Sequence, residues 1–314
     1  LGGSVALVRS ATGCGWRGLV TCGSVWACAV CSARIRAERA ADVQRVVAWH
    51  TAQHGHGAAF LLTLTIAHQK GDDLRRLRSG LATAWRRFRQ GAPFERWASK
   101  VGLVGTVRGL EVKTGPNGWH PHLHLVVLVR HPSELEASRA WMAQRWIDCV
   151  QKVDGLGSAH APSVAHGLSL DGCHRADYLC KLGLEVVAPG QKDGQTRRNG
   201  HRTPFELLRD IEAHGRQLDR DLWMAWCDGI RGARMLTWSK GLREAAELGP
   251  EQSDEQLATE KEPARVIAEI PAEEWDRVRH VPGLHAAMLD AAELGGGEHA
   301  LELLGRAARG RWPP

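Results

Sequence analysis

Three histidines stand at alternate positions in the segment WHPHLHLVVLV, residues 119–129: His120, His122 and His124. In a β-strand, alternate side chains project from the same face, so the three imidazoles would share one side of a sheet. The other side would carry apolar residues only. Because strand backbone holds its side chains firmly, imidazoles spaced in this way predict a metal site. A histidine-rich surface strand without a ligand is the alternative.

A carboxylate is expected beside these histidines. Val101–Lys113 has the composition of a strand, and the Gly-Pro-Asn-Gly run at 115–118 predicts a turn into the histidine strand. The two strands would then form a hairpin. Glu111 lies eleven residues before His122. Across such a hairpin, side chains on one face approach to about 5 Å, which is close enough to share an ion.

Glu111, His122 and His124 would supply one carboxylate and two imidazoles, with coordination positions left open for water or substrate. Mixed nitrogen and oxygen ligands favour Mn²⁺, or else Mg²⁺, over a closed structural zinc site. His120, at the start of the strand, is expected either to support the ligands or to contact DNA. The alternative for Glu111 is a solvated carboxylate at a strand end.

The chain has a single tyrosine, Tyr178, and a lysine follows three residues later, Lys181. On a helix these two side chains share a face, so the phenol and the ammonium could address one substrate together. A phenol has a pKa of about 10 and needs a nearby cation or base to become a nucleophile at neutral pH. Lys181 could supply the positive charge. The alternative is an ordinary core tyrosine with an amphipathic lysine beside it.

Four of the eight cysteines lie close together near the N-terminus: Cys14, Cys22, Cys28 and Cys31. Four thiolates over such a short stretch, with one Cys-x-x-Cys pair, predict a structural zinc site. The alternatives are a redox pair, which lacks its usual strand–helix context here, and reduced buried cysteines. A disulfide framework is typical of much shorter secreted chains, so we expect a cytosolic, reducing compartment.

The elements expected from periodicity describe an α+β protein. The chain has 314 residues, 43% of them hydrophobic and 24% charged, which is typical of a soluble globular protein. The order strand–helix–strand–strand–helix–strand, followed by helices, predicts a central antiparallel sheet flanked by helices. No apolar run approaches the roughly 20 residues that span a bilayer, so no membrane partner is expected. Helices are expected at 33–54, 72–90, 133–150, 175–182, 204–215, 218–230 and 238–248, and further strands at 60–66 and 164–170.

The positive charge of the chain suits a polyanionic partner. The net charge is +6, the pI is about 9.0, and arginine, the better bidentate phosphate ligand, greatly outnumbers lysine. The arginines within 75–89 and the loop 197–202 are candidate phosphate contacts. The alternative for them is a solvated helix face and a surface loop.

Three ordered motifs resemble those of a known family. They are the strand Phe60–Thr65 (FLLTLT), the pair His122-Leu123-His124, and Tyr178-x-x-Lys181. Together they resemble the replication initiators of rolling-circle plasmids, which belong to the HUH endonuclease superfamily, and most closely those from actinobacterial plasmids. The resemblance covers residues 14–248, including the segment 238–243, and implies a ferredoxin- or RRM-like sheet. Thr63 and Thr65 are expected to serve that sheet near the site.

The resemblance implies a nicking and joining mechanism. Tyr178 would attack the scissile phosphodiester at the plasmid's double-strand origin and become linked to the 5′ phosphate. A divalent metal on Glu111, His122 and His124 would act as a Lewis acid, and Lys181 would neutralise the phosphate. The released 3′-OH would prime synthesis without ATP. Implied partners are duplex and single-stranded origin DNA, a host helicase and a DNA polymerase, in the bacterial cytoplasm.

One position departs from the family pattern. Some relatives carry an acidic residue four positions before the tyrosine, where it activates water at termination; here that residue is His174. The termination step is therefore open, and a single tyrosine excludes a two-tyrosine exchange within one chain. Rival hypotheses are a conjugative relaxase or HUH transposase, and a zinc-stabilised DNA-binding protein without catalysis. The expected divisions are a Cys-rich zinc segment (1–35), a catalytic domain (36–203), a helical extension (204–249), and an acidic linker with a helical tail (250–314).

Overall fold

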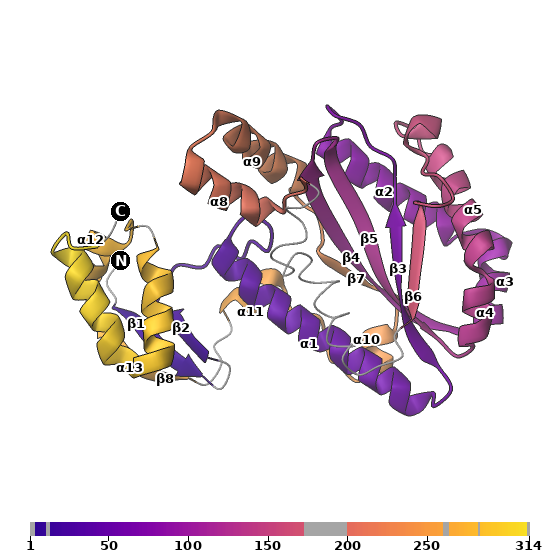
Figure 1. Cartoon of the computed structure of the whole chain (residues 1–314). Coiled ribbons are helices and arrows are strands. Elements are labelled where there is room, and N and C mark those ends of the chain that lie inside the picture. Colours follow the sequence, from indigo (N-terminus) through magenta and orange to yellow (C-terminus); the bar gives the residue numbers. More distant parts are fainter. Residues whose placement is uncertain (1–3, 11–12, 173–199, 260–263, 282, 313–314) are drawn as a thin grey trace. The chain divides into compact units, whose positions relative to one another are not determined.

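The chain forms two compact units. The computed structural model describes residues 4–10, 13–172, 200–259, 264–281 and 283–312. Gly23–Leu257 make up the larger unit, and Leu1–Cys22 join Ala258–Pro314 in the smaller one. Both contain an antiparallel sheet flanked by helices, which confirms the α+β class (Figure 1). Within the smaller unit, strands from the two ends of the chain pair with each other. The expected functional divisions at 1–35, 36–203, 204–249 and 250–314 stay predictions.

A five-stranded sheet organises the larger unit, in the order β6-β3-β5-β4-β7. Every pairing in it is antiparallel. The long strands β4 and β5 form the predicted hairpin, in which Gly115 pairs with Gly118. Gly118 has φ +90, and a Cβ there would lie 3.0 Å from the Gln69 carbonyl oxygen, so the turn requires glycine. The strands are β3 (Ala58–Thr65), β4 (Leu103–Gly115), β5 (Gly118–Val129), β6 (Leu168–Gly172) and β7 (Leu236–Trp238).

The two faces of β5 have different surroundings. One face is apolar and fully buried from Trp119 to Val129. It is covered by α2 (Leu74–Phe88), α5 (Arg139–Gln151) and α9 (Gln217–Ile230), and Trp146 of α5 donates a 2.7 Å hydrogen bond to the Thr65 carbonyl. The other face carries the three histidines and then Val126 and Leu128. Helix α1 (Ala29–Gln53) lies on this side (Figure 1).

Most arginines at the start of α2 are engaged by protein carbonyls. Arg75 donates to the Asp228 carbonyl at 2.9 Å, Arg76 to that of Gly155 at 2.6 Å and Arg78 to that of Gly229 at 3.1 Å. These bonds fasten α2 to neighbouring segments. Arg86 and Arg87, near the C-terminal end of α2, are exposed. Arg75, Arg76 and Arg89 are exposed as well, so α2 presents several of the arginines predicted to contact phosphate at its surface.

Several elements depart from the sequence-based expectation. The segment expected as a helix over 238–248 instead contributes Trp238 to the edge strand β7, opposite Val107, and the helix α10 starts only at Leu242. Gly241, with φ +78, separates the two. The expected helix 133–150 breaks at Ser138, whose hydroxyl donates to the Glu134 carbonyl at 2.6 Å. Remaining helices of this part are α3 (Gly91–Val101), α4 (Pro132–Ala137), α8 (Pro204–His214), α10 (Leu242–Ala245), α11 (Asp254–Thr259) and the 3₁₀ turn η1 (Gly157–His160).

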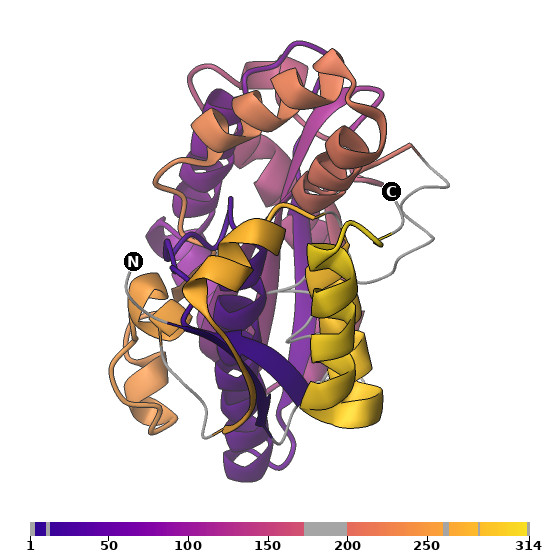
Figure 2. The same ribbon diagram turned by 90° about the vertical axis from the view of Figure 1, so that its left-hand side faces the viewer.

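The smaller unit has its own core. Strands β1 (Val5–Ser10), β2 (Gly13–Arg17) and β8 (Arg265–Ile270) pack against α12 (Ala272–Val278) and α13 (Leu284–Ala308) (Figure 2). The α13 helix bends at Gly296, where φ is +80. A Cβ on the next residue, Gly297, would collide with the Ile267 carbonyl oxygen, so close helix–strand packing requires glycine there. The tail therefore contains a strand that the sequence did not predict. No helix within the described ranges is both long and apolar enough to cross a membrane.

A buried ion network attaches α8 and α9 to the hairpin. The backbone of Arg202 forms a bridge with Thr114, and its guanidinium contacts Asp210 at 2.9 Å and Asp219 at 2.6 Å. Asp219 is only 2% exposed and also accepts from Arg216 at 2.8 Å. Because a buried carboxylate needs compensating charge, this network couples the helical pair to the sheet.

Replacing Arg202 with methionine should destabilise the larger unit by about 2 kcal/mol, because it leaves Asp219 buried with one exposed partner, Arg216. The measurement is chemical denaturation followed by tryptophan fluorescence. Arg45→Met is the matched control: Arg45 is 62% exposed and pairs with Asp42, so its loss should cost about 0.5 kcal/mol or less. Equal effects of the two substitutions would contradict a structural role for the Arg202 network.

Candidate functional site

The register of the three central strands brings the predicted ligands together. Glu111 on β4 is directly opposite His122 on β5, and Gly109 is opposite His124. On the other side of β5, Thr65 pairs with His122 and Thr63 with His124. Backbone pairing therefore places one carboxylate, two imidazoles and two hydroxyls on a single face. Glycine at 109 leaves the space beside His124 free of a competing side chain.

Each of the two predicted ligand histidines, His122 and His124, is oriented by a threonine. The Thr63 hydroxyl lies 3.0 Å from Nδ1 of His124, and the Thr65 hydroxyl lies 2.9 Å from Nδ1 of His122. Both imidazoles are thus held through the same nitrogen, and Nε2 of each ring points away from its threonine. Sequence reasoning placed Thr63 and Thr65 only near the site. Their hydroxyls in fact set the direction of both predicted ligands.

His124 also bonds to the carboxylate. Its Nε2 lies 2.7 Å from Glu111 Oε2. Because a carboxylate only accepts, Nε2–H donates, and in the neutral ring Nδ1 then accepts from the Thr63 hydroxyl. If Nε2 were to bind a cation instead, the ring proton would have to move to Nδ1. A threonine hydroxyl can accept as well as donate, so Thr63 is compatible with both tautomers.

The electrostatics of the face favour an ionised Glu111 carboxylate beside a neutral His122 imidazole. Burial opposes ionisation of Glu111, but the hydrogen bond from His124 and the charges of His124 and Lys113 outweigh it and hold the pKa of Glu111 well below its usual range. Burial, and next the neighbouring His120, lower the pKa of His122 to about 3. These are the protonation states in which such groups bind a cation.

One oxygen of the carboxylate has no properly oriented donor. The Lys113 ammonium lies 2.8 Å from Glu111 Oε1, yet the two are not aligned for a hydrogen bond, and this oxygen is fully buried. A buried carboxylate oxygen without a donor and an imidazole oriented by a hydroxyl suit a hard or borderline divalent cation. The donor atoms of Glu111, His122 and His124 do not all lie within 4.8 Å of one another. Binding an ion would therefore require the His124–Glu111 hydrogen bond to open.

Three of the four clustered cysteines come together. The sulfur atoms of Cys22, Cys28 and Cys31 all lie within 4.8 Å of one another. Cys28 caps the N-terminus of α1, and its sulfur accepts from the Cys31 amide at 3.5 Å. Cys14 lies instead in β2, where it packs against the core of the smaller unit. The sequence predicted a set of four thiolates. The structure brings three of them together and does not include Cys14.

Side chains distant in sequence also contribute to the histidine face. Arg36 of α1 is close enough to Glu111 to feel its charge: burial lowers the pKa of this guanidinium to about 10, while Glu111 opposes the shift. His68 and His201 gather around His120, with ring centroids 4.3 and 5.8 Å from it. No spacing in the sequence signals these neighbours, because each arrives from a different segment of the chain.

The predicted nucleophile lies outside the described residues, as do Lys181 and His174. The last strand before it, β6, ends at Gly172 opposite Phe60 of β3. The description resumes at Gly200, just before Arg202 bridges to Thr114.

Comparison with known proteins agrees with the motifs. Residues 19–165 match the model of a family described as replication protein. The chain is 29% identical to "Protein rep" of Streptomyces lividans over 72% of its own length and 64% of that protein's. It is 34% identical to a "Neomycin resistance protein" of Streptomyces cyanogenus over 36% of its own length and 31% of that protein's.

The chain therefore spans less than two thirds of the length of either curated relative. No solved structure matches it significantly. The family match and the Streptomyces lividans relative both agree with the expectation of a Rep protein.

The histidine face should make the metal-free protein less stable in mild acid. Unfolded histidines take up protons near pH 6.5, whereas burial lowers the pKa of His120 to about 4 and that of His122 to about 3. At pH values between the unfolded and the folded pKa, the unfolded state binds more protons than the folded state, so the free energy of unfolding falls as the pH falls. Urea unfolding in EDTA, measured from about pH 7 down to about pH 4, tests this.

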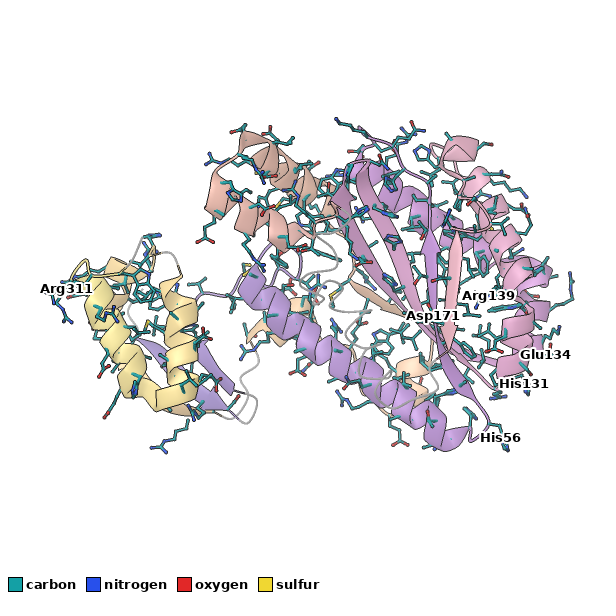
Figure 3. All side chains as sticks on the ribbon, viewed as in Figure 1. His56, His131, Glu134, Arg139, Asp171 and Arg311 are labelled. Carbon is teal, nitrogen blue, oxygen red and sulfur yellow. The ribbon has the colours of Figure 1, made fainter. Side chains whose placement is uncertain are left out.

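His120→Gln should flatten that pH dependence, since it removes one of the suppressed protonations. His131→Gln is the control, because His131 is an exposed residue after β5 (Figure 3). A pH slope that His120→Gln leaves unchanged would assign the acid sensitivity to other groups.

Proposed function

We propose that this protein nicks and rejoins plasmid DNA to initiate rolling-circle replication, using Tyr178 as the nucleophile. The observation that carries the proposal is the register-fixed set of Glu111, His122 and His124, oriented by two threonine hydroxyls on one sheet face. In the sequence, the chain's single tyrosine follows β6, a strand of the same sheet, by six residues. The similarity to replication proteins supports the assignment to replication.

The covalent chain allows Tyr178 to reach this face. Tyr178 is six residues beyond Gly172, the end of β6. Gly172 pairs with Phe60, and Thr63 and Thr65 lie three and five residues further along β3. Three to five strand residues cover ~10–17 Å, whereas six residues of extended chain reach ~20 Å. The distance is therefore compatible with the proposed nucleophile.

The residues divide the chemistry among them. The Tyr178 oxygen forms a bond to phosphorus, and the bond from phosphorus to the 3′ oxygen breaks, leaving a 5′-phosphotyrosine and a free 3′-OH. The phosphoester energy is retained, so rejoining needs no ATP. Glu111, His122 and His124 would hold Mn²⁺ or Mg²⁺, which supplies Lewis-acid stabilisation of the phosphate charge. Lys181 would keep the phenol ionised and neutralise the phosphate.

The proposed substrate is origin DNA, recognised as duplex and cut as a single strand. A host helicase and a DNA polymerase would act on the released 3′-OH. Conjugative relaxases and HUH transposases share the chemistry, but the matches to replication proteins favour an initiator. A binding protein without catalysis would form no covalent adduct, so adduct formation separates that class from the other two.

The cysteine cluster is proposed to hold structural zinc. Three sulfur atoms within 4.8 Å of one another, two of them in one Cys-x-x-Cys pair at the start of α1, suit a thiolate zinc site. Such an ion would hold in place the segment that leads into α1, the helix that carries Arg36 to the histidine face.

Tyr178→Phe should abolish the covalent protein–DNA adduct, because phenylalanine has no oxygen to attack phosphorus. The assay incubates the full chain with labelled single strands covering the plasmid origin and Mn²⁺, and detects the adduct on a denaturing gel. Binding of duplex origin DNA should be unchanged. An adduct that persists in Tyr178→Phe would overturn the choice of nucleophile.

Glu111→Ala should lower metal-dependent cleavage by about 100-fold or more, since it removes a proposed metal ligand, and it should spare duplex binding. Glu95→Ala, at an exposed position on α3, is the matched carboxylate control. Cleavage rates that are equal in the two variants would remove Glu111 from the metal site while leaving the role of Tyr178 open.

A further inference from the structure

A second group of imidazoles lies next to the proposed nicking site. His120 is its centre: its ring centroid is 4.3 Å from that of His68, 5.8 Å from that of His201 and 4.0 Å from that of His122. The three outer rings come from separate parts of the chain. His68 follows β3, His122 is on β5, and His201 precedes the bridge between Arg202 and Thr114. Such convergence is not imposed by local sequence.

Two nitrogens of this group have no hydrogen-bond partner among the described residues. Nε2 of His120 and Nδ1 of His201 are fully buried and have no hydrogen-bond partner within the described part of the chain. Leaving a buried polar atom unpaired costs about 1–3 kcal/mol each. Two such atoms in one cluster therefore point to a ligand that would satisfy them.

The third imidazole has a defined tautomer. Nδ1 of His68 lies 3.0 Å from the Asn117 carbonyl oxygen. A carbonyl only accepts, so Nδ1–H donates, and Nε2 of the neutral ring carries a lone pair. Histidines that bind metals commonly donate their other ring N–H to a backbone carbonyl in this way. His68 is thus already in the form that a metal requires.

We propose that His68, His120 and His201 form a second metal site, which takes a borderline divalent ion such as Ni²⁺, Co²⁺ or Zn²⁺. An all-imidazole donor set favours these ions over Mn²⁺ and Mg²⁺. Lys113 pairs with His120 across the two strands. Its ammonium forms an ion pair with Glu111, so its positive charge is already compensated. A neutral set of lone-pair donors suits a cation better than an anion.

The spacing of the rings is near that of a bound site. Two imidazoles on one ion at about 2.0–2.1 Å place their ring centroids roughly 5–6 Å apart, and the His120–His201 pair is at 5.8 Å. The His68 ring is closer to His120, at 4.3 Å, and must rotate outward to share the ion. The three donor atoms do not yet lie within 4.8 Å of one another. His68 and His201 are both outside regular helices and strands, where such rotation is least restricted.

The test measures Ni²⁺ binding by the metal-stripped full chain in equilibrium dialysis, with no DNA and no activity readout. His68→Ala and His201→Ala should each remove one equivalent of Ni²⁺ or weaken it by about tenfold or more. His56→Ala is the matched control, because His56 is exposed on the loop after α1 (Figure 3). It should bind Ni²⁺ as the unchanged protein does.

Glu111→Gln distinguishes this site from the proposed nicking site. It should retain the Ni²⁺ that His68→Ala and His201→Ala lose, because Glu111 belongs only to the first ligand set. His68→Asn and His201→Asn, checked for folding by circular dichroism, repeat the test with a smaller change in polarity. Unchanged Ni²⁺ stoichiometry in the Ala and Asn variants of both His68 and His201 would overturn the proposal. Loss of the same ion in Glu111→Gln or in His56→Ala would also overturn it. None of these outcomes bears on adduct formation by Tyr178.

Discussion

The pairing register of β3, β5 and β4 is the constraint on which the rest of the histidine face depends. It sets Thr65 beside His122 and His122 beside Glu111 in one row across the sheet. A slip of one residue in either pairing would turn a ligand to the opposite face, since side chains alternate along a strand. The register is fixed by the apolar residues that alternate with the histidines. These residues must remain buried against α2, α5 and α9. Core packing on one face thus specifies polar geometry on the other.

The hydrogen bonds built on this register restrict the orientation of the side chains that form them. The threonine hydroxyls hold the histidines from one side, and the Glu111 carboxylate, 6% exposed, receives His124 from the other. An ionised carboxylate at this depth needs positive charge nearby, which Lys113 supplies directly. Arg36 adds a further cation from α1. The sheet holds the groups in place, and the surrounding cations keep the carboxylate ionised.

Short-range patterns in the sequence were enough to predict the Glu111–His122 part of this row. Alternation of histidine with apolar residues gave the strand, the Gly-Pro-Asn-Gly run gave the turn, and the two together placed Glu111 opposite His122. The hydroxyls were harder to place, because pairing of β3 with β5 joins segments about sixty residues apart in sequence. The approach of His68, His201 and Arg36 was not predictable at all, since it depends on where loops and a helix pack. The same holds for β8, which pairs with β1 from the opposite end of the chain.

The hydrogen bond between His124 and Glu111 gives the face two alternative states. Without a cation, the carboxylate takes its stabilisation from Nε2–H of His124 and from the neighbouring ammonium of Lys113. A divalent ion on the same atoms would compete with that bond and would require the ring proton to be on Nδ1, where Nδ1–H can donate a hydrogen bond to the Thr63 hydroxyl oxygen. Valine at 63 would preserve the shape of the strand but not this exchange. A threonine at this position is therefore explained by proton placement in addition to strand propensity.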